Sequence, residues 1–285
     1  MTNQEKWKRL SAILDEAEAY GRAIGKLNFD MECCAPEEGM EQAGDDMALL
    51  GKHIHALTHS PEYAALVGEL HADGEGLSFA QRKTVEHLWE RYEKGKNITE
   101  EFDHAWSVAA NRAYGKWLAA KKASDFSLFR DSLAEVVDFT RKAIDLRDEK
   151  PASYYNACLD DTEKGGSEAQ MDAFFGALKE RIVPLMRRIQ AEGKPIREDF
   201  LTRPCPIPEQ ERFSHYLLEV EGLRKSALVL MTTEHPFTTE FGPHDVRVTT
   251  HYFEDNFISN IFSTLHEGGH ALFMQNEPEE FWREH

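Results

Sequence analysis

The stretch His266-Glu267-Gly268-Gly269-His270 holds the residues best suited to chemistry. Two histidines four positions apart share one face of an α-helix, so both imidazole rings can reach one metal ion. The glutamate between them is rotated by about 100° along the helix, which aims its carboxylate at a water molecule rather than at the metal. Two histidine ligands, one further ligand and a carboxylate base are the components of zinc-assisted hydrolysis. The pattern predicts a hydrolase that uses Zn²⁺, and another divalent ion such as Co²⁺ would suit the same ligands.

The two adjacent glycines within this motif strengthen the functional interpretation. Each glycine inside a helix costs roughly 1 kcal/mol relative to alanine. Gly268 and Gly269 therefore predict that a substrate or a neighbouring strand approaches the helix backbone closely. The alternative is a chance match on an ordinary helix, because H-E-x-x-H alone is only moderately specific.

The elements that must position this motif are mostly helical. Apolar residues recur at helical spacing over much of the first 200 residues. Irregular segments are expected at 28–39 and 151–166, where proline, glycine or turn residues interrupt the pattern. We predict a helical region at 1–200 that lines a groove, and the start of a catalytic region at 201–285. The expected helices cover residues 3–27, 40–57, from Ser60 onward, 78–94, 99–121, 127–148, 167–192 and 209–221.

A small β-hairpin is predicted immediately before the histidine-bearing helix. Residues 228–231 and 235–241 are candidate strands, and residues 246–252 alternate β-branched and other side chains after a turn at 242–245. The helix itself is expected over 256–275. An extended peptide could bind by adding to an exposed strand beside this helix, and a structural lid is the alternative role for the hairpin. The predicted fold class is mainly α, with this hairpin as its β component.

The bulk composition limits the classes of partner that we expect this protein to bind. The chain has 285 residues, 41% of them hydrophobic, and a net charge of −18. Such an acidic protein repels phosphate backbones and anionic lipid surfaces, so neither nucleic acid nor a membrane is expected as a partner. No apolar segment after Met1 suggests a signal peptide, which favours a cytoplasmic location. The four cysteines are spaced unlike a disulfide framework, and we expect them to be reduced: Cys33, Cys34, Cys158 and Cys205.

Three ordered motifs resemble a known family. They are His235-Pro236-Phe237, then Asp245-Val246-Arg247-Val248-Thr249, then His266 to Phe273. Together they resemble the H-P-F, D-x-R-x-T and H-E-x-x-H-A-L motifs of the carboxypeptidase Taq family of thermostable-type zinc metallocarboxypeptidases. Residues 27–32 and 155–161 look like two further family segments, so the resemblance extends over the whole chain.

The resemblance implies a zincin-like helical metallopeptidase fold with a long groove. It also implies an enzyme, usually a homodimer, that removes amino acids one at a time from the C-termini of peptide substrates. By resemblance, His266 and His270 are zinc ligands and Glu267 is the general base and proton shuttle. Within the D-x-R-x-T element, Arg247 and Thr249 are assigned to substrate binding. A structural ion pair with a carboxylate is the alternative for Arg247, and Asp245 is expected to form the turn.

The sequence departs from the family pattern at the third zinc ligand. The family takes this ligand, a glutamate, from a later H-E-S/G-Q element that residues 1–285 do not contain. Pro278 ends the zinc helix and no later glycine supports a reversal of the chain, so we expect the third ligand beyond residue 285. We therefore expect an N-terminal portion of a longer enzyme, inactive alone and weak in zinc binding. The late residues that could overturn this expectation are Glu277, Glu279, Glu280, Glu284 and His285.

Two other functions remain open from the residues alone. A thimet-type oligopeptidase shares the zinc helix and the groove, although the H-P-F and D-x-R-x-T elements argue against it. The second alternative is a helical fragment that holds no metal and has no catalytic role. Assays on peptides with free and blocked C-termini distinguish a carboxypeptidase from an oligopeptidase. Metal analysis tests whether the chain is a fragment that holds no metal.

Overall fold

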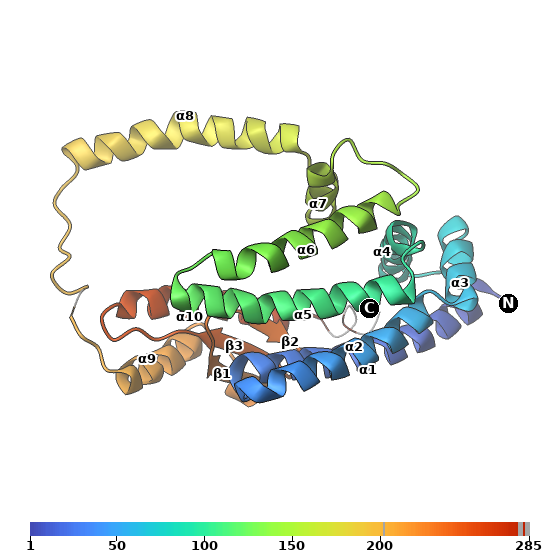
Figure 1. Ribbon diagram of the computed structural model, residues 1–285, viewed down its shortest axis with the longest axis horizontal. Helices are drawn as coiled ribbons and strands as arrows, with labels where there is room; N and C mark the ends of the chain where they lie inside the picture. The colour runs from blue at the N-terminus through green and yellow to red at the C-terminus, as the bar shows by residue number, and fades with distance from the viewer. Residues whose placement is uncertain (202, 279–281, 283–285) are drawn as a thin grey trace. The chain divides into compact units, whose positions relative to one another are not determined.

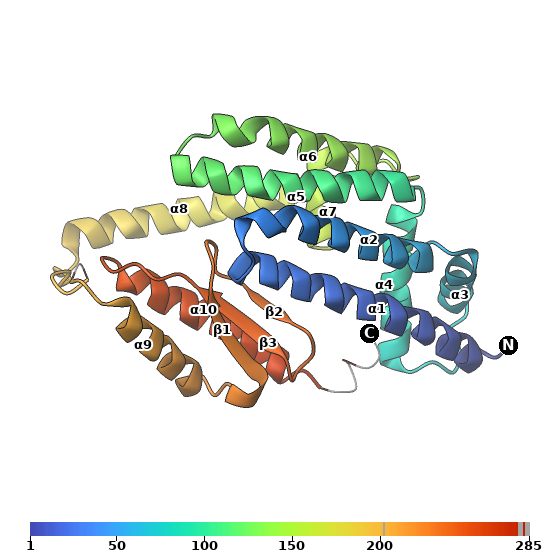
Figure 2. The ribbon, with the colours of Figure 1, turned by 60° about the horizontal axis from the view of Figure 1, so that its bottom comes forward.

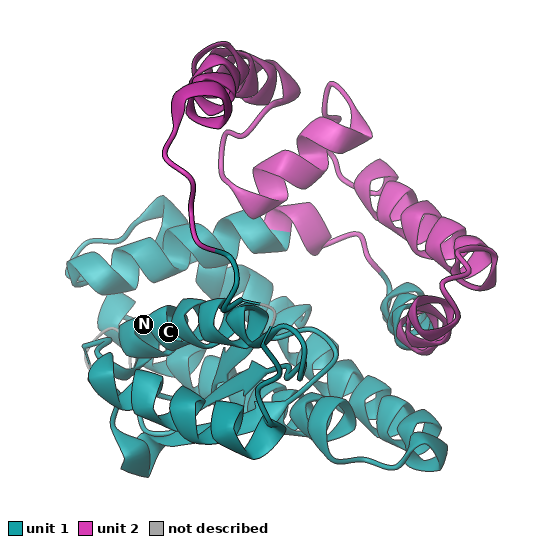
Figure 3. Cartoon of the chain, turned by 90° about the vertical axis from the view of Figure 1, so that its left-hand side faces the viewer, with its two compact units in different colours: residues 1–92, 99–111, 198–285 teal, residues 93–98, 112–197 magenta. Residues whose placement is uncertain are grey.

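The computed structural model describes residues 1–201, 203–278 and 282, and the chain forms two compact units (Figure 3). Unit 1 contains residues 1–92, 99–111 and 198–285, and unit 2 contains residues 93–98 and 112–197. Within the described residues no helix combines the length and apolarity needed to cross a membrane. The predicted division into a groove-lining region at 1–200 and the start of a catalytic region at 201–285 is a division by function, and it stays a prediction. The compact units group residues differently, since 198–285 belong with 1–92.

Unit 1 begins with two long helices that run side by side, α1 (Asn3–Cys33) and α2 (Met40–Thr58) (Figures 1 and 2). A 3₁₀ turn at Glu37–Gly39 separates them. The helix α3 (Pro61–Ala72) packs against α1, and α4 (Phe79–Gly95) and α5 (Glu100–Ala123) follow. The core between α1, α3 and the start of α4 is apolar because each helix contributes a stripe with helical spacing. Its buried members are Trp7, Leu10, Ile13, Leu14, Tyr63, Leu66, Val67, Leu70, Leu77 and Val85.

The end predicted for the first helix is wrong by six residues. The helix continues through the segment 28–33, which was expected to be irregular. Phe29 and Met31 are buried in that segment, so burying their side chains favours continuing the helix. Pro36 follows shortly after the helix ends, in keeping with the restriction that proline places on the residue before it. The long first helix brings Phe29 to the β-strands described next.

Three short strands form a mixed sheet in unit 1: β1 (Leu228–Thr232), β2 (Thr238–Glu240) and β3 (Val246–Thr250). Their order is β1-β3-β2, with β3 parallel to β1 and antiparallel to β2. The predicted hairpin is confirmed, and Gly242 supplies its turn at a φ of +121°. The second strand of the hairpin lies in the centre of the sheet, so the edge strand of the hairpin is β2.

Two helices pack beside this sheet, α9 (Ile207–Val220) and α10 (Phe257–Gln275). A second 3₁₀ turn, Lys225–Ala227, leads into β1. Figure 2 shows α10 beside the strands, and α10 packs against β3, β2 and α9. The bounds of α10 agree with the predicted 256–275 within one residue. The core of this part consists of buried Leu218, Leu223, Val246, Val248 and Ala271.

Unit 2 is helical and contains the later part of α5 followed by α6 (Ser127–Asp145), α7 (Tyr154–Thr162) and α8 (Glu168–Glu192). The loop predicted at 151–166 is wrong in its middle, where α7 forms. Its start is capped because the Ser153 hydroxyl accepts a hydrogen bond from the Asn156 amide at 3.1 Å. Its end is held by Asp161, which pairs with Lys94 and Arg147.

Candidate metal centre

The helix α10 has two faces with different tasks. Its buried face packs on α9 and β3 and contains Asn260, Thr264, Gly268, Ala271 and Gln275. Its opposite face presents the exposed His266 and His270. These polar and small residues, at a spacing of three and four, therefore anchor the helix, and the histidines remain accessible.

The two histidines have the separation that one metal ion requires. Their Nε2 atoms lie 3.3 Å apart, and the ring planes are nearly perpendicular at 86°. Two nitrogens bound to one tetrahedral zinc at about 2.0–2.1 Å are about 3.3–3.4 Å apart. The pair predicted from the i, i+4 spacing is thus brought together in a geometry that fits zinc.

Glu267 lies between α10 and the edge strand β2. Its side chain is only 7% exposed. The Thr238 hydroxyl lies 2.7 Å from its Oε2 and 2.9 Å from its main-chain oxygen. The carboxylate is therefore held off the histidine face, as the 100° rotation predicted.

The described residues supply two candidate metal ligands, His266 and His270, and no third. Among residues 1–201, 203–278 and 282, no three His, Cys, Asp or Glu side chains could hold a metal ion together. Glu277, the first of the late candidates, is among these residues. The other late candidates, Glu279, Glu280, Glu284 and His285, lie outside the described residues. The donor set present fits zinc in spacing and chemistry, and it needs one more ligand.

The two glycines of the motif have different surroundings. A Cβ added to Gly268 would lie 1.8 Å from Glu221 Oε2 and 3.0 Å from Leu218 Cδ2. Apart from its chain neighbours and the nearby backbone of α10, no described atom lies within 4 Å of a Cβ added to Gly269. The predicted close approach is confirmed at Gly268, but the neighbour is the C-terminal end of α9 rather than a strand or a substrate. Gly269 borders open space.

A buried polar network fixes the α10 backbone one turn before the histidines. The Asn260 Oδ1 atom accepts hydrogen bonds from the hydroxyls of Ser214 at 3.1 Å, Thr250 at 2.8 Å and Thr264 at 3.1 Å. All four residues are buried, and they come from α9, β3 and α10. Sequence reasoning missed this network because polar residues at helical spacing usually face solvent. The available signal was the i, i+4 pair of Asn260 and Thr264 on the face opposite His266.

Arg247 is held by contacts within unit 1. Its guanidinium donates to both carboxylate oxygens of Asp245 at 2.9 and 3.1 Å and lies 5.0 Å from the Phe29 ring centre and 4.8 Å from that of Phe241. These hydrogen bonds, with weaker help from Lys26, hold the pKa of Asp245 below its ordinary value. The observed contacts are those of the structural ion pair considered as the alternative, and they join α1 to the hairpin.

Thr249 has no exposed surface. Its hydroxyl accepts a hydrogen bond from the Phe237 amide at 2.7 Å and donates to the Phe237 carbonyl at 3.0 Å. The Thr233 hydroxyl lies 3.0 Å from the Thr249 hydroxyl oxygen and 2.8 Å from the His235 carbonyl oxygen. The predicted substrate-binding threonine thus lies inside the sheet, where it contacts the H-P-F segment.

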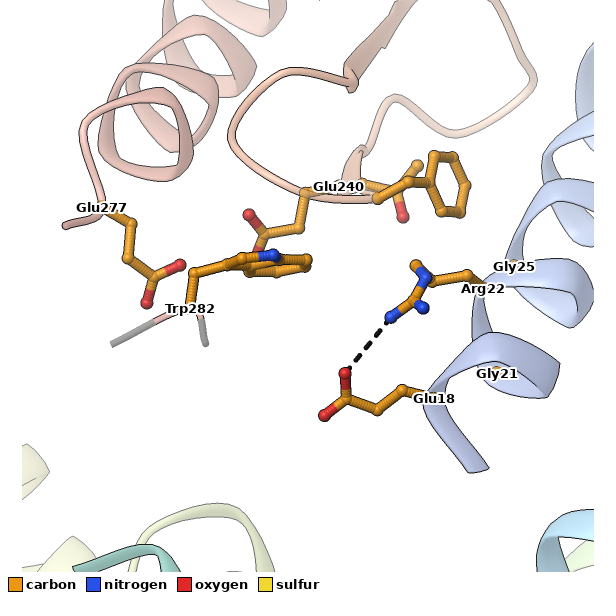
Figure 4. A pocket seen from close by; sticks show the side chains of 9 residues that line it. Glu18, Gly21, Arg22, Gly25, Glu240, Glu277 and Trp282 are labelled. Atoms are coloured by element: carbon orange, nitrogen blue, oxygen red, sulfur yellow. Dashed lines mark hydrogen bonds and ion pairs between the residues drawn. The ribbon is translucent and has the colours of Figure 1, made fainter. Parts of the chain in front are cut away.

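A cavity of about 500 Å³ opens beside the end of β2 (Figure 4). Figure 4 shows Glu18 and Arg22 of α1 on one side, joined by an ion pair of 3.2 Å, with Glu240 and Trp282 across from them. Burial, with a smaller contribution from the nearby Glu277, raises the pKa of Glu240. The cavity borders the same strand whose first residue contacts Glu267.

The chain is similar to known metallocarboxypeptidases. The family model described as Carboxypeptidase Taq (M32) metallopeptidase matches residues 9–285. Carboxypeptidase 1 of Bacillus subtilis is 32% identical over 94% of this chain and 54% of its own length. Thermostable carboxypeptidase 1 of Thermus thermophilus is 31% identical over 99% of this chain and 57% of its own. The chain thus spans little more than half the length of these relatives.

Solved structures show the same fold. The crystal structure of BsuCP is 32% identical and matches 97% of this chain and 55% of its own with a TM-score of 0.91. The structure of Pyrococcus furiosus carboxypeptidase, in the form called Apo-Mg, is 31% identical. It matches 97% of this chain and 56% of its own, with a TM-score of 0.82. The expected mainly helical fold, with a small hairpin before the helix that carries His266 and His270, is confirmed.

Proposed function

The chain belongs to the carboxypeptidase Taq (M32) metallopeptidase family, and from this premise we propose that it provides the metal-binding helix of a zinc-dependent carboxypeptidase. Such an enzyme removes amino acids from the C-termini of peptides. The main support is the 3.3 Å separation of the His266 and His270 Nε2 atoms, with the Glu267 carboxylate held next to them but off their face. The third ligand is proposed to come from outside residues 1–285.

The residues of this chain would divide the reaction as follows. His266 and His270 hold the zinc ion, which acts as a Lewis acid when bound. Glu267 takes a proton from the attacking water molecule and delivers it to the leaving nitrogen. The water oxygen bonds to the carbonyl carbon of the last peptide bond, the C–N bond breaks, and the C-terminal amino acid leaves with a free amine.

The strand β2 is the proposed guide for the peptide. The Phe237 carbonyl and the Phe241 amide bond to Thr249 and Asp245 and so face β3. Because neighbouring residues of a strand point their main-chain groups in opposite directions, those of Thr238 and Glu240 point away from β3. An extended peptide can add to this edge, which would lay it past Glu267.

A substitution of the base tests the proposal. In the active enzyme that contains residues 1–285, Glu267→Gln should lower kcat by about 10²–10⁴-fold, the usual value of general acid–base catalysis. The zinc content should stay the same, because glutamine keeps the shape of the side chain and leaves both histidines in place. Activity is measured on one peptide with a free C-terminus and on the same peptide with an amidated C-terminus. Near wild-type turnover in the variant would exclude Glu267 as the base, and equal cleavage of both peptides would exclude a carboxypeptidase.

The family resemblance also supports three finer proposals for the intact enzyme. We propose that its metal is zinc, that it is a homodimer and that it is cytoplasmic. Metal analysis of the purified enzyme, light scattering and cell fractionation test these three points separately.

A further inference from the structure

Glu267 is a carboxylate in a buried position, and burial of a charged group is costly without a hydrogen-bond donor. The Thr238 hydroxyl, 2.7 Å from Oε2, is such a donor. It belongs to a different element from the glutamate, 29 residues earlier in the chain. The orientation of the carboxylate therefore depends on where β2 places Thr238.

The position of Thr238 is fixed from the residue before it. Thr249 contacts the main chain of Phe237 three times. Its amide donates to the Phe237 carbonyl at 2.8 Å, and its hydroxyl contacts the Phe237 amide and carbonyl. The Phe237 ring also meets the ring of Phe29 edge-on, with 6.1 Å between the centroids. On the strand itself, Thr238 is paired with the buried Val248.

We propose that Thr238 is a positioning residue for Glu267, the last member of a path that runs from Thr249 through Phe237. This inference rests on the proposed function, since it concerns the general base of that reaction. It gives the D-x-R-x-T and H-P-F elements a shared physical task. Thr249 and the H-P-F main chain set the place of one hydroxyl, and that hydroxyl engages Oε2 and leaves the other oxygen to face the water molecule.

The first test compares three variants in the active enzyme that contains residues 1–285. Thr238→Val keeps the shape of the side chain and removes the hydroxyl, so kcat should fall by about 10- to 100-fold, the loss expected when a catalytic group is displaced by about 1 Å. KM and zinc content should stay close to wild type. Thr238→Ser, which restores a hydroxyl, should recover most of kcat. The control is Thr232→Val, the same change at an exposed position of β1, which should leave kcat unchanged.

A double-mutant cycle separates positioning from a general structural effect. Once Glu267 is replaced by glutamine, no general base remains to be positioned. Thr238→Val should then cause little further loss of residual activity. An undiminished loss in the Glu267→Gln background, or a Thr238→Ser variant as slow as Thr238→Val, would overturn the proposal.

The hydrogen bond is also tested without activity, in the metal-free 285-residue protein. Thr238→Val should lower the midpoint of urea unfolding more when Glu267 is present than in a Glu267→Ala background, where only the contact of the hydroxyl with the main-chain oxygen of residue 267 remains. Thr238→Ala removes the same hydroxyl and replaces Thr238→Val in the cycle should that variant not fold. Equal shifts in both backgrounds would show that the two side chains are not coupled and would overturn the proposal. This measurement stands even if the enzyme proves to have another activity, so the two failures are distinguishable.

Discussion

At the scale of single residues, the two glycines of the metal-binding motif offer a matched pair. Alanine favours a helix over glycine by about 1 kcal/mol. Gly269→Ala has open space and should raise the free energy of unfolding by up to this amount. Gly268→Ala meets Glu221 and Leu218, so it should be destabilising by about 1–3 kcal/mol, the usual cost of overpacking.

Urea unfolding of the two metal-free variants measures both effects. We predict that the two changes in unfolding free energy have opposite signs. Both variants replace a glycine by alanine in the same helix and at nearly the same distance from the histidines, so the difference reports on the surroundings. If both variants were stabilised, α9 would not approach Gly268 as closely as the structure shows.

At the scale of elements, the buried Asn260 connects α9, β3 and α10. Asn260→Ala leaves three buried hydroxyls without their shared acceptor, so it should cost about 1–3 kcal/mol of stability or more. Amide hydrogen exchange should increase along α10. Asn276→Ala serves as the control, since Asn276 is exposed and its side chain, among the described residues, bonds to the Leu272 carbonyl of its own helix. Unchanged exchange in α10 of Asn260→Ala would contradict the role of this network.

The elements also show what the sequence could and could not predict. Long helices and the zinc helix were predictable because their apolar residues repeat with helical spacing, and the hairpin because its turn and its β-branched strand are local features. The extra turns of α1 were not, since they depend on burial of Phe29 against residues about 200 positions later. The short α7 depends on Lys94 and Arg147, and the parallel pairing of β1 with β3 depends on the whole sheet.

The site was predictable where it depends on one helix and not where it depends on contacts between elements. His266, Glu267 and His270 follow from spacing within one helix, and the structure gives them the expected arrangement. Two contacts were not predictable: the Thr238 hydroxyl next to Glu267, and the buried Asn260 oxygen that accepts three hydrogen bonds. Both join residues of different elements, so no local sequence pattern indicates them. The roles assigned to the site residues stay predictions for the experiments above.

At the scale of the whole molecule, zinc affinity is the most informative measurement. The 285-residue protein alone should bind zinc weakly and should show no peptidase activity, because its described residues offer two imidazoles and no third ligand. Dialysis against zinc followed by metal analysis checks this. One tightly held zinc per monomer would instead show that a late residue such as Glu284 or His285 completes the site, and alanine variants of these residues would identify it.

The discontinuous make-up of unit 1 has a consequence for the order of events during synthesis. Unit 2 is complete once residue 197 has been made, whereas unit 1 still needs the 88 residues from 198 to 285 (285 − 197 = 88). A ribosome adds about 5–20 residues per second, and domains generally fold as units as they emerge. Unit 2 can therefore fold while α1 still lacks the strands that cover Phe29. During those seconds a chaperone can bind the uncovered side of α1, and the helix α10 is made only after the strands.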